Sequence, residues 1–164
     1  MIKIHNLYVQ VAFIVFASVF TSLLFNQLRN NALPFMKTKV EVVSSLQSIT
    51  IKSSEPSITG IDLELAKKLF EKNTLFIDAR AKEFYNEGHI PNAICSDDFD
   101  VLVEKLENAI GLDDQFVVYC SDSDCGSSED LSYELQSFGY NNILLFKGGW
   151  KEWTDANLVQ TTYE

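Results

Sequence analysis

The chain has 164 residues and a formal net charge of −10 at pH 7. This length provides one domain of ordinary size and excludes a second enzyme domain. Seventeen of the 23 acidic residues lie from Glu83 onward, where only three of the 13 basic residues fall. Such a surface argues against nucleic-acid binding and favours a neutral or basic partner. A solvated acidic face that aids solubility explains most of the charge equally well.

An apolar segment comes first in the chain. Residues 7–25 have Gln10 as their only strongly polar member, and a helix of that length would span about 28 Å, close to a hydrocarbon core. A cleaved signal peptide is the alternative, but no small-residue cleavage pattern follows Phe25. We therefore predict a single-pass anchor over residues 1–25 that holds the protein to a membrane through residues 7–25.

The orientation of this anchor follows from the charges on either side of it. Lys3 precedes the apolar segment, whereas Arg29, Lys37 and Lys39 follow it, and the positive-inside rule alone favours a cytoplasmic domain. A short charged N-terminus before a first apolar helix also suits an anchor that exports the domain on its C-terminal side. We expect export, with the soluble domain in a periplasm or another extracytoplasmic space, where disulfides persist.

Residues 26–56 are predicted to form a linker. They are rich in Asn, Ser and Lys, contain Pro34 and Pro56, and show no long periodic pattern. Two short apolar stretches, 40–43 and 46–51, could each add a strand.

The segment from residue 57 onward alternates helices and strands. Apolar residues at helical spacing predict a helix around Leu65 and Leu69, and a strand over 74–77 follows and ends at Asp78. The next predicted elements are a short helix over 82–86, a turn over 88–91, a short strand over 93–95 and a helix over 99–110.

The next strand leads directly to a cysteine. An apolar run over 116–119 precedes Cys120, and a polar loop then opens a helix near Ser127. Unpaired N–H groups and the macrodipole of a helix N-terminus favour a thiolate, which is the nucleophilic form of cysteine. A further strand over 143–146 and a short final helix complete a βαβ unit, so we predict an α/β fold with a parallel sheet.

Three blocks of sequence occur in one order: FIDARAKEFYNEGHIPNAI, a single cysteine after VVY, and FGYNNILLFKGGWKEW. Together they resemble a rhodanese-like domain. The resemblance implies a three-layer domain over 57–158, with a five-stranded parallel sheet flanked by helices, and a C-terminal tail over 159–164. It also implies that backbone N–H groups surround Cys120, which takes sulfane sulfur from a donor, holds it as a persulfide and passes it to an acceptor. The expected partners are a sulfur donor or acceptor protein or a small thiol, without a cofactor.

The loop after the cysteine departs from the family pattern. The family has an arginine at the sixth position, counted from the cysteine, where this chain has Cys125. Asp122 and Asp124 would raise the pKa of a nearby thiol and repel an anionic donor, so thiosulfate is expected to be a poor donor. The expected active-site loop contains Ser121, Asp122, Ser123, Asp124, Gly126 and Ser127.

Cys125 has three interpretations. It lies five residues after Cys120, so a loop could bring the two α-carbons within the roughly 4.4 to 6.8 Å that a disulfide requires. Cys125 would then be a redox partner, or a resolving thiol that attacks a Cys120 persulfide and releases sulfide. Alternatively, it is a small buried residue in the place of the arginine. Metal binding is disfavoured, because two thiols without a CxxC or a histidine cluster are a weak zinc signal.

Several other residues near the expected site are interpreted as structural. Asp78 and Arg80 could bind substrate, but a pair between Arg80 and Asp78 or Glu83 that fixes the turn is favoured. His89 could be a general base, but its ring can satisfy nearby backbone. Core packing is favoured for Cys95 and for two tryptophans, Trp150 and Trp153.

Three function classes follow. The first is a membrane-tethered sulfurtransferase that carries persulfide on Cys120. The second is a thiol redox protein that uses Cys120 and Cys125. The third is a rhodanese-like binding module without turnover.

Overall fold

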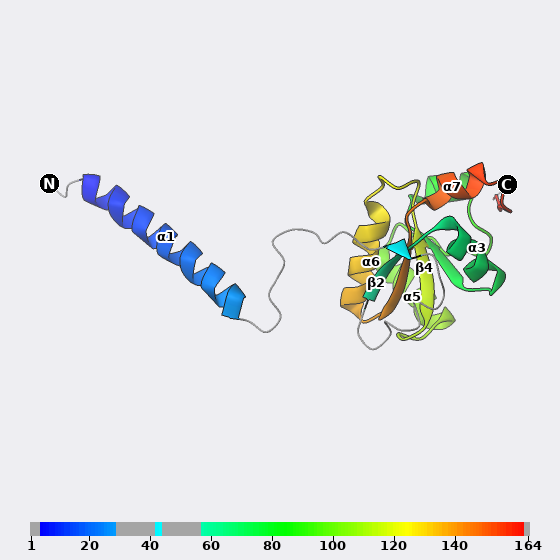
Figure 1. The fold of residues 1–164 in the computed structure, drawn as a ribbon, viewed down its shortest axis with the longest axis horizontal. Helices are drawn as coiled ribbons and strands as arrows, with labels where there is room; N and C mark the ends of the chain where they lie inside the picture. Colours follow the sequence, from blue (N-terminus) through cyan, green and yellow to red (C-terminus); the bar gives the residue numbers. More distant parts are fainter. Residues whose placement is uncertain (1–3, 29–41, 44–56, 163–164) are drawn as a thin grey trace. The chain divides into compact units, whose positions relative to one another are not determined.

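The computed structural model describes residues 4–28, 42–43 and 57–162 (Figure 1). The chain forms two compact units, 1–39 and 40–164. Most of the predicted linker, including the possible strand over 46–51, lies outside the described residues.

The first unit contains helix α1, Ile4–Leu28. Residues 8–27 are long and apolar enough to cross a membrane, with a mean hydropathy of 2.0, and no other described helix meets this criterion. The hydroxyls of Ser18 and Thr21 donate to carbonyl oxygens one turn earlier, at 2.8 Å each, so these polar side chains are satisfied within the helix. Length and composition fit either a membrane span or a signal sequence, and the anchor remains a prediction.

The second unit contains a parallel sheet with the strand order β1-β2-β5-β4-β3. Its four longer strands are β2 (Ser57–Ile61), β3 (Leu75–Asp78), β4 (Gln115–Tyr119) and β5 (Asn142–Phe146). The edge strand β1 has only two residues, Val42–Val43, which pair with Gly60 and Ile61. The prediction of five strands is therefore corrected to a sheet of four strands with a two-residue addition at one edge.

The predicted strand over residues 93–95 is wrong. Only Ile94 pairs with the sheet, through an isolated bridge to Ile77 beside β3. The next carbonyl, that of Cys95, accepts a hydrogen bond from Lys105 Nζ at 2.9 Å instead of from a neighbouring strand. Strand β2 was not predicted, because its SITGI sequence is short and includes a glycine.

Helices cover both faces of the sheet, as the α/β prediction requires (Figure 1). Alternate residues of β4 point to opposite faces: Val117 and Tyr119 join one buried cluster, whereas Phe116 and Val118 join the other. The first cluster includes residues of α3 (Leu63–Glu71) and α7 (Gly149–Asp155), and the second includes residues of α5 (Phe99–Ala109) and α6 (Ser127–Phe138). A short helix, α4 (Lys82–Glu87), follows β3.

Helix α7 fixes the chain immediately after β4. The N–H of Trp150 donates to the carbonyl of Cys120, and the N–H of Lys151 donates to that of Ser121, each at 2.8 Å. Gly149 makes this approach possible, because its φ is +59° and a Cβ at this position would lie 2.4 Å from the Cys120 carbonyl oxygen. The start of α7 therefore positions the segment that carries Cys120.

Replacing Gly149 by alanine should make the domain easier to unfold. Gly149→Ala adds a Cβ where both the backbone conformation and the neighbouring carbonyl oppose it, so we expect a loss of about 2 kcal/mol or more in the free energy of unfolding. The measurement is denaturant unfolding of the full chain in detergent, with tryptophan fluorescence as the signal.

Gly126→Ala is the matched control. Gly126 has a φ of −77°, and the nearest atom to an added Cβ is 3.9 Å away. Its effect should stay within about 1 kcal/mol. Equal stability of the two variants would contradict the role assigned to Gly149.

Candidate functional site

Cys120 lies at the carboxyl end of β4, which runs between β3 and β5 in the sheet. The residue is 2% exposed. Polar and reactive groups of parallel sheets gather at this end of the strands, because the loops there connect to helix N-termini. The location of Cys120 agrees with the strand-loop-helix arrangement predicted from the sequence.

A disulfide joins Cys120 to Cys125, with the two α-carbons 6.2 Å apart. This distance lies within the range expected from the spacing of the two cysteines. Cys125 is half-buried, so it is the more accessible of the two. The position that holds an arginine in the family pattern is therefore covalently connected to the cysteine.

The loop between the two cysteines is organised by Asp122. Its side chain accepts a hydrogen bond from the N–H of Asp124 at 3.0 Å, and its carbonyl accepts one from the N–H of Cys125 at 3.3 Å. Two loop N–H groups are thus bonded to Asp122, whereas the family resemblance implied N–H groups around Cys120. Ser121, Ser123 and Gly126 are exposed, and Ser127 is the first residue of α6.

Asp78 and Arg80 form a buried ion pair beside this loop. Arg80 Nη2 lies 2.6 Å from Asp78 Oδ2, and Arg80 Nε lies 2.9 Å from Asp78 Oδ1. Burial lowers the pKa of Arg80, but hydrogen bonding and charge from Asp78 more than compensate and raise it. Arg80 Nη2 also donates to the Gly88 carbonyl. Of the two carboxylates considered from the sequence, Asp78 is the one that pairs with Arg80.

Tyr119 completes this network, and sequence reasoning missed it. Its hydroxyl donates to Asp78 Oδ2 at 2.7 Å and accepts from the Ile90 N–H at 3.2 Å. Burial, followed by the charge of Asp78, raises the pKa of Tyr119. The available signal was a tyrosine among the apolar residues of β4, paired in register with Asp78 on β3. The residue that precedes Cys120 is therefore fixed to the neighbouring strand.

Trp150 connects α7 to the same network. Its ring lies over the guanidinium of Arg80, with 4.8 Å between Arg80 Cζ and the ring centroid. Trp153 is 1% exposed and belongs to the core, as predicted. Trp150 is half-buried and packs against the same core cluster from its edge.

His89 is held by contacts with α4 and with a segment near the C-terminus. Its Nδ1 lies 2.8 Å from the Tyr85 carbonyl, and the two rings stack with centroids 3.8 Å apart. Its backbone pairs with Thr161 through two hydrogen bonds of 2.9 Å. The ring Nδ1 and the backbone of His89 thus both have partners within the protein, and its structural role stays a prediction.

Cys95 is buried, and its thiol donates to the Arg80 carbonyl at 3.4 Å. Burial, assisted by the charges of Asp78 and Asp97, raises the pKa of this thiol to about 11. Packing rather than nucleophilic chemistry is the role that this environment supports.

Removing one partner of the ion pair should destabilise the domain strongly. Asp78→Asn keeps the shape of the side chain but leaves the Arg80 charge buried and uncompensated, so unfolding should become easier by about 3–5 kcal/mol. Denaturant unfolding of the full chain measures this loss. Glu64→Gln, which removes the exposed contact with Lys67, should leave the unfolding midpoint unchanged within error. A similar effect of both variants would contradict the assignment.

Cys95 should resist alkylation in the folded protein. Its thiolate fraction at pH 8 should be about a hundredfold lower than that of a thiol with a pKa near 9, and burial slows the reaction further. With the disulfide intact, Cys95 is the remaining thiol, so the mass of the intact chain after treatment with N-ethylmaleimide reports on it alone. Labelling should become fast in urea. Equally fast labelling without urea would refute this prediction.

Comparisons with known proteins identify the family. The model of the rhodanese-like domain matches residues 62–156. No curated protein sequence matches the chain. Structural relatives include the Alr3790 protein of Anabaena sp., which is 21% identical with a TM-score of 0.53, the match covering 62% of this chain and 80% of that one.

Two further structures have the same fold. The BH2092 protein of Bacillus halodurans is 19% identical with a TM-score of 0.54, the match covering 71% of this chain and 82% of that one. A thiosulfate sulfurtransferase of Pseudomonas aeruginosa is 18% identical with a TM-score of 0.54, covering 72% of this chain but only 22% of that one. The match of the family model to more than half of the sequence shows that this chain belongs to the rhodanese-like family.

Proposed function

We propose that this domain carries sulfane sulfur as a persulfide on Cys120 and that Cys125 is its resolving thiol. The observation that carries the proposal is the Cys120–Cys125 disulfide, which occupies the place of the family's arginine. Membership of the sulfurtransferase superfamily supports the role of Cys120. The short separation of the two cysteines supports the role of Cys125.

The chemistry has two steps. The Cys120 thiolate attacks the terminal sulfur of a donor of the form R–S–SH; the donor S–S bond breaks, RS⁻ leaves and Cys120 becomes a persulfide. The Cys125 thiolate then attacks Cys120 Sγ, HS⁻ leaves and the disulfide forms. An acceptor thiolate that takes the terminal sulfur first would return Cys120 as a thiolate. The disulfide is two electrons more oxidised than the dithiol, so an external dithiol must reduce it.

Exposure determines which sulfur a reductant attacks. Cys120 is 2% exposed, whereas Cys125 is half-buried, so an incoming thiolate attacks Cys125 Sγ and Cys120 leaves as the thiolate. Helix α6 begins two residues after Cys125, and its N-terminus favours a negative charge. Reduction thereby returns Cys120 in its nucleophilic form.

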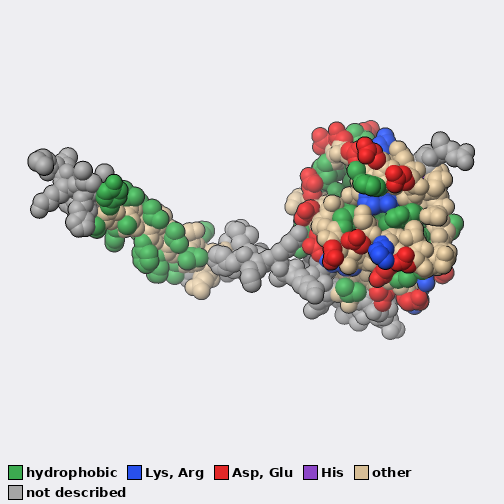
Figure 2. All heavy atoms as spheres, turned by 90° about the horizontal axis from the view of Figure 1, so that it is seen from above, with side chains coloured by type: hydrophobic (Ala, Val, Ile, Leu, Met, Phe, Trp, Pro, Cys, Tyr) green, Lys and Arg blue, Asp and Glu red, His purple; other side chains and the backbone are tan. Residues whose placement is uncertain are grey.

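The charges around the loop favour certain donors. Asp122 and Asp124 lie between the two cysteines, and the family's anion-binding arginine is absent. Acidic side chains are also spread over the visible face of the second unit, with few basic ones (Figure 2). Like charges repel an anion. A neutral or basic persulfidated protein is therefore a better donor than thiosulfate, which is a dianion. A hydropolysulfide carries a single negative charge near pH 7, so the loop repels it less than it repels thiosulfate.

The proposed function includes attachment of the protein to a membrane. The exposed apolar side chains of α1, including Phe13 and Phe16, support membrane attachment through residues 7–25. An extracytoplasmic location of the domain would agree with a stable disulfide, because oxidising compartments preserve such bonds.

A second candidate, a thiol redox protein without sulfur transfer, is favoured by the same disulfide. The two candidates differ in one respect: only the first adds a sulfur atom to Cys120. A binding module would neither gain a sulfur atom on Cys120 nor use the two cysteines as a redox pair.

The test is intact-mass analysis of the full chain in detergent, reduced, freed of reductant and exposed separately to polysulfide and thiosulfate before alkylation. Polysulfide should add one sulfur atom to Cys120, followed by sulfide release and disulfide formation, while thiosulfate adds little. In Cys125→Ser the persulfide should persist at least roughly tenfold longer, because an intramolecular thiol has a high effective concentration.

Cys120→Ser should gain no sulfur, and Cys95→Ser is the matched control that should behave as the unmodified chain. Disulfide formation with a mild oxidant but no sulfur gain from polysulfide would replace the proposal with the redox protein. No change under any condition would leave only the binding module.

A further inference from the structure

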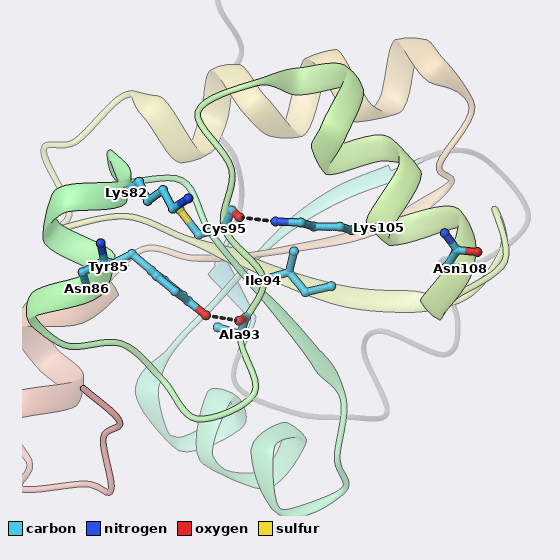
Figure 3. Close-up of a pocket in the computed structure, with 8 residues that line it drawn as sticks. All are labelled: Lys82, Tyr85, Asn86, Ala93, Ile94, Cys95, Lys105 and Asn108. Atoms are coloured by element: carbon cyan, nitrogen blue, oxygen red, sulfur yellow. Dashed lines mark hydrogen bonds between the residues drawn. The ribbon is translucent and has the colours of Figure 1, made fainter. Parts of the chain in front are cut away.

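A large pocket lies between α4 and α5, and none of its described lining residues belongs to the loop over 120–127 (Figure 3). Its volume is about 970 Å³, which is in the range of sites for small organic ligands. The segment over 93–95 lies between the two helices and supplies Ala93, Ile94 and Cys95.

Two ammonium groups approach this pocket from opposite sides. Lys82 extends from α4 and Lys105 from α5, on either side of Cys95 (Figure 3). Lys105 Nζ donates to the Cys95 carbonyl at 2.9 Å. The described lining residues include no carboxylate, although the chain has a net charge of −10. In contrast, Lys147 and Lys151 each pair with an acidic side chain.

The apolar part of the pocket is held in place by its own contacts. Tyr85 OH donates to the Ala93 carbonyl at 2.7 Å, and the Tyr85 ring stacks on His89. The Cys95 thiol donates to the Arg80 carbonyl. These groups are committed within the protein. The other side-chain donors among the described lining residues are the ammonium groups of Lys82 and Lys105 and the amides of Asn86 and Asn108. Lys105 and Asn108 each use one N–H within the protein, for the carbonyls of Cys95 and Glu104.

We propose that this pocket binds a small organic anion, a compound with an apolar body and one carboxylate or sulfonate group. The Asp97 carboxylate accepts a hydrogen bond from the backbone N–H of Lys82 and is not among the described lining residues. The ammonium groups of Lys82 and Lys105 recognise the anionic group, and Tyr85 and Ile94 contact the apolar body. The proposal is independent of the chemistry of Cys120, because it involves different residues.

Chemical footprinting of lysines tests the proposal without any substitution. The full chain in detergent is reductively dimethylated in the presence of increasing sodium 2-naphthoate, and the modified sites are identified by mass spectrometry. Labelling of Lys82 and Lys105 should slow at least about threefold and reach a plateau, while Lys68 of α3 and Lys72, which directly follows α3, should be unaffected. Unchanged labelling of Lys82 and Lys105, or equal slowing at all four lysines, would overturn the proposal.

Calorimetric titration of the same probe then identifies the charges involved, with micelles alone as the blank. Lys82→Gln and Lys105→Gln should each weaken binding about three- to tenfold, and the double variant should show no saturation. Lys68→Gln is the matched control and should bind as the unmodified chain. The uncharged 2-naphthamide should bind at least about fivefold more weakly. Equal affinity in the double variant, or equal binding of the amide, would show that the pocket does not select an anion.

Discussion

The buried carboxylate of Asp78 is the constraint on which the site depends. It accepts hydrogen bonds from the Arg80 side chain, the Arg80 N–H and the Tyr119 hydroxyl. A buried charge is costly unless such partners compensate it. The contacts form one network, so the loss of any one of them would weaken the others. They join the end of β3 to the end of β4 and, through the bond between Arg80 and the Gly88 carbonyl, to the turn that follows α4.

This network and helix α7 together determine the position of Cys120. Tyr119, the last residue of β4, is bonded to Asp78 at the end of β3, while the Trp150 N–H at the start of α7 donates to the Cys120 carbonyl. Trp150 also covers Arg80, so the same residue contacts the ion pair and the cysteine backbone. The backbone of Cys120 is therefore held by contacts from β3 and from α7.

The sequence predicted those elements whose residues carry strong local signals. Helical spacing around Leu65 and the apolar run over 116–119 were sufficient to predict α3 and β4. Strand β2 and the single bridge at Ile94 could not be predicted in this way, because tertiary pairing decides both. The position of Cys120 followed from the strand-loop-helix pattern. The role of Tyr119 did not, because its partner lies 41 residues earlier in the chain.

Replacing the loop arginine by Cys125 changes what the loop can offer to Cys120. An arginine attracts anions and stabilises a thiolate through space, and it does so irrespective of oxidation state. A cysteine can instead form a bond to the same sulfur, which removes the nucleophile until a reductant restores it. Asp122, whose carboxylate and carbonyl organise the intervening turn, adds negative charge beside that bond. In the proposed function, this bond is what sulfur transfer between thiols requires, whereas residues 120–127 contain no cation that would capture a small inorganic anion.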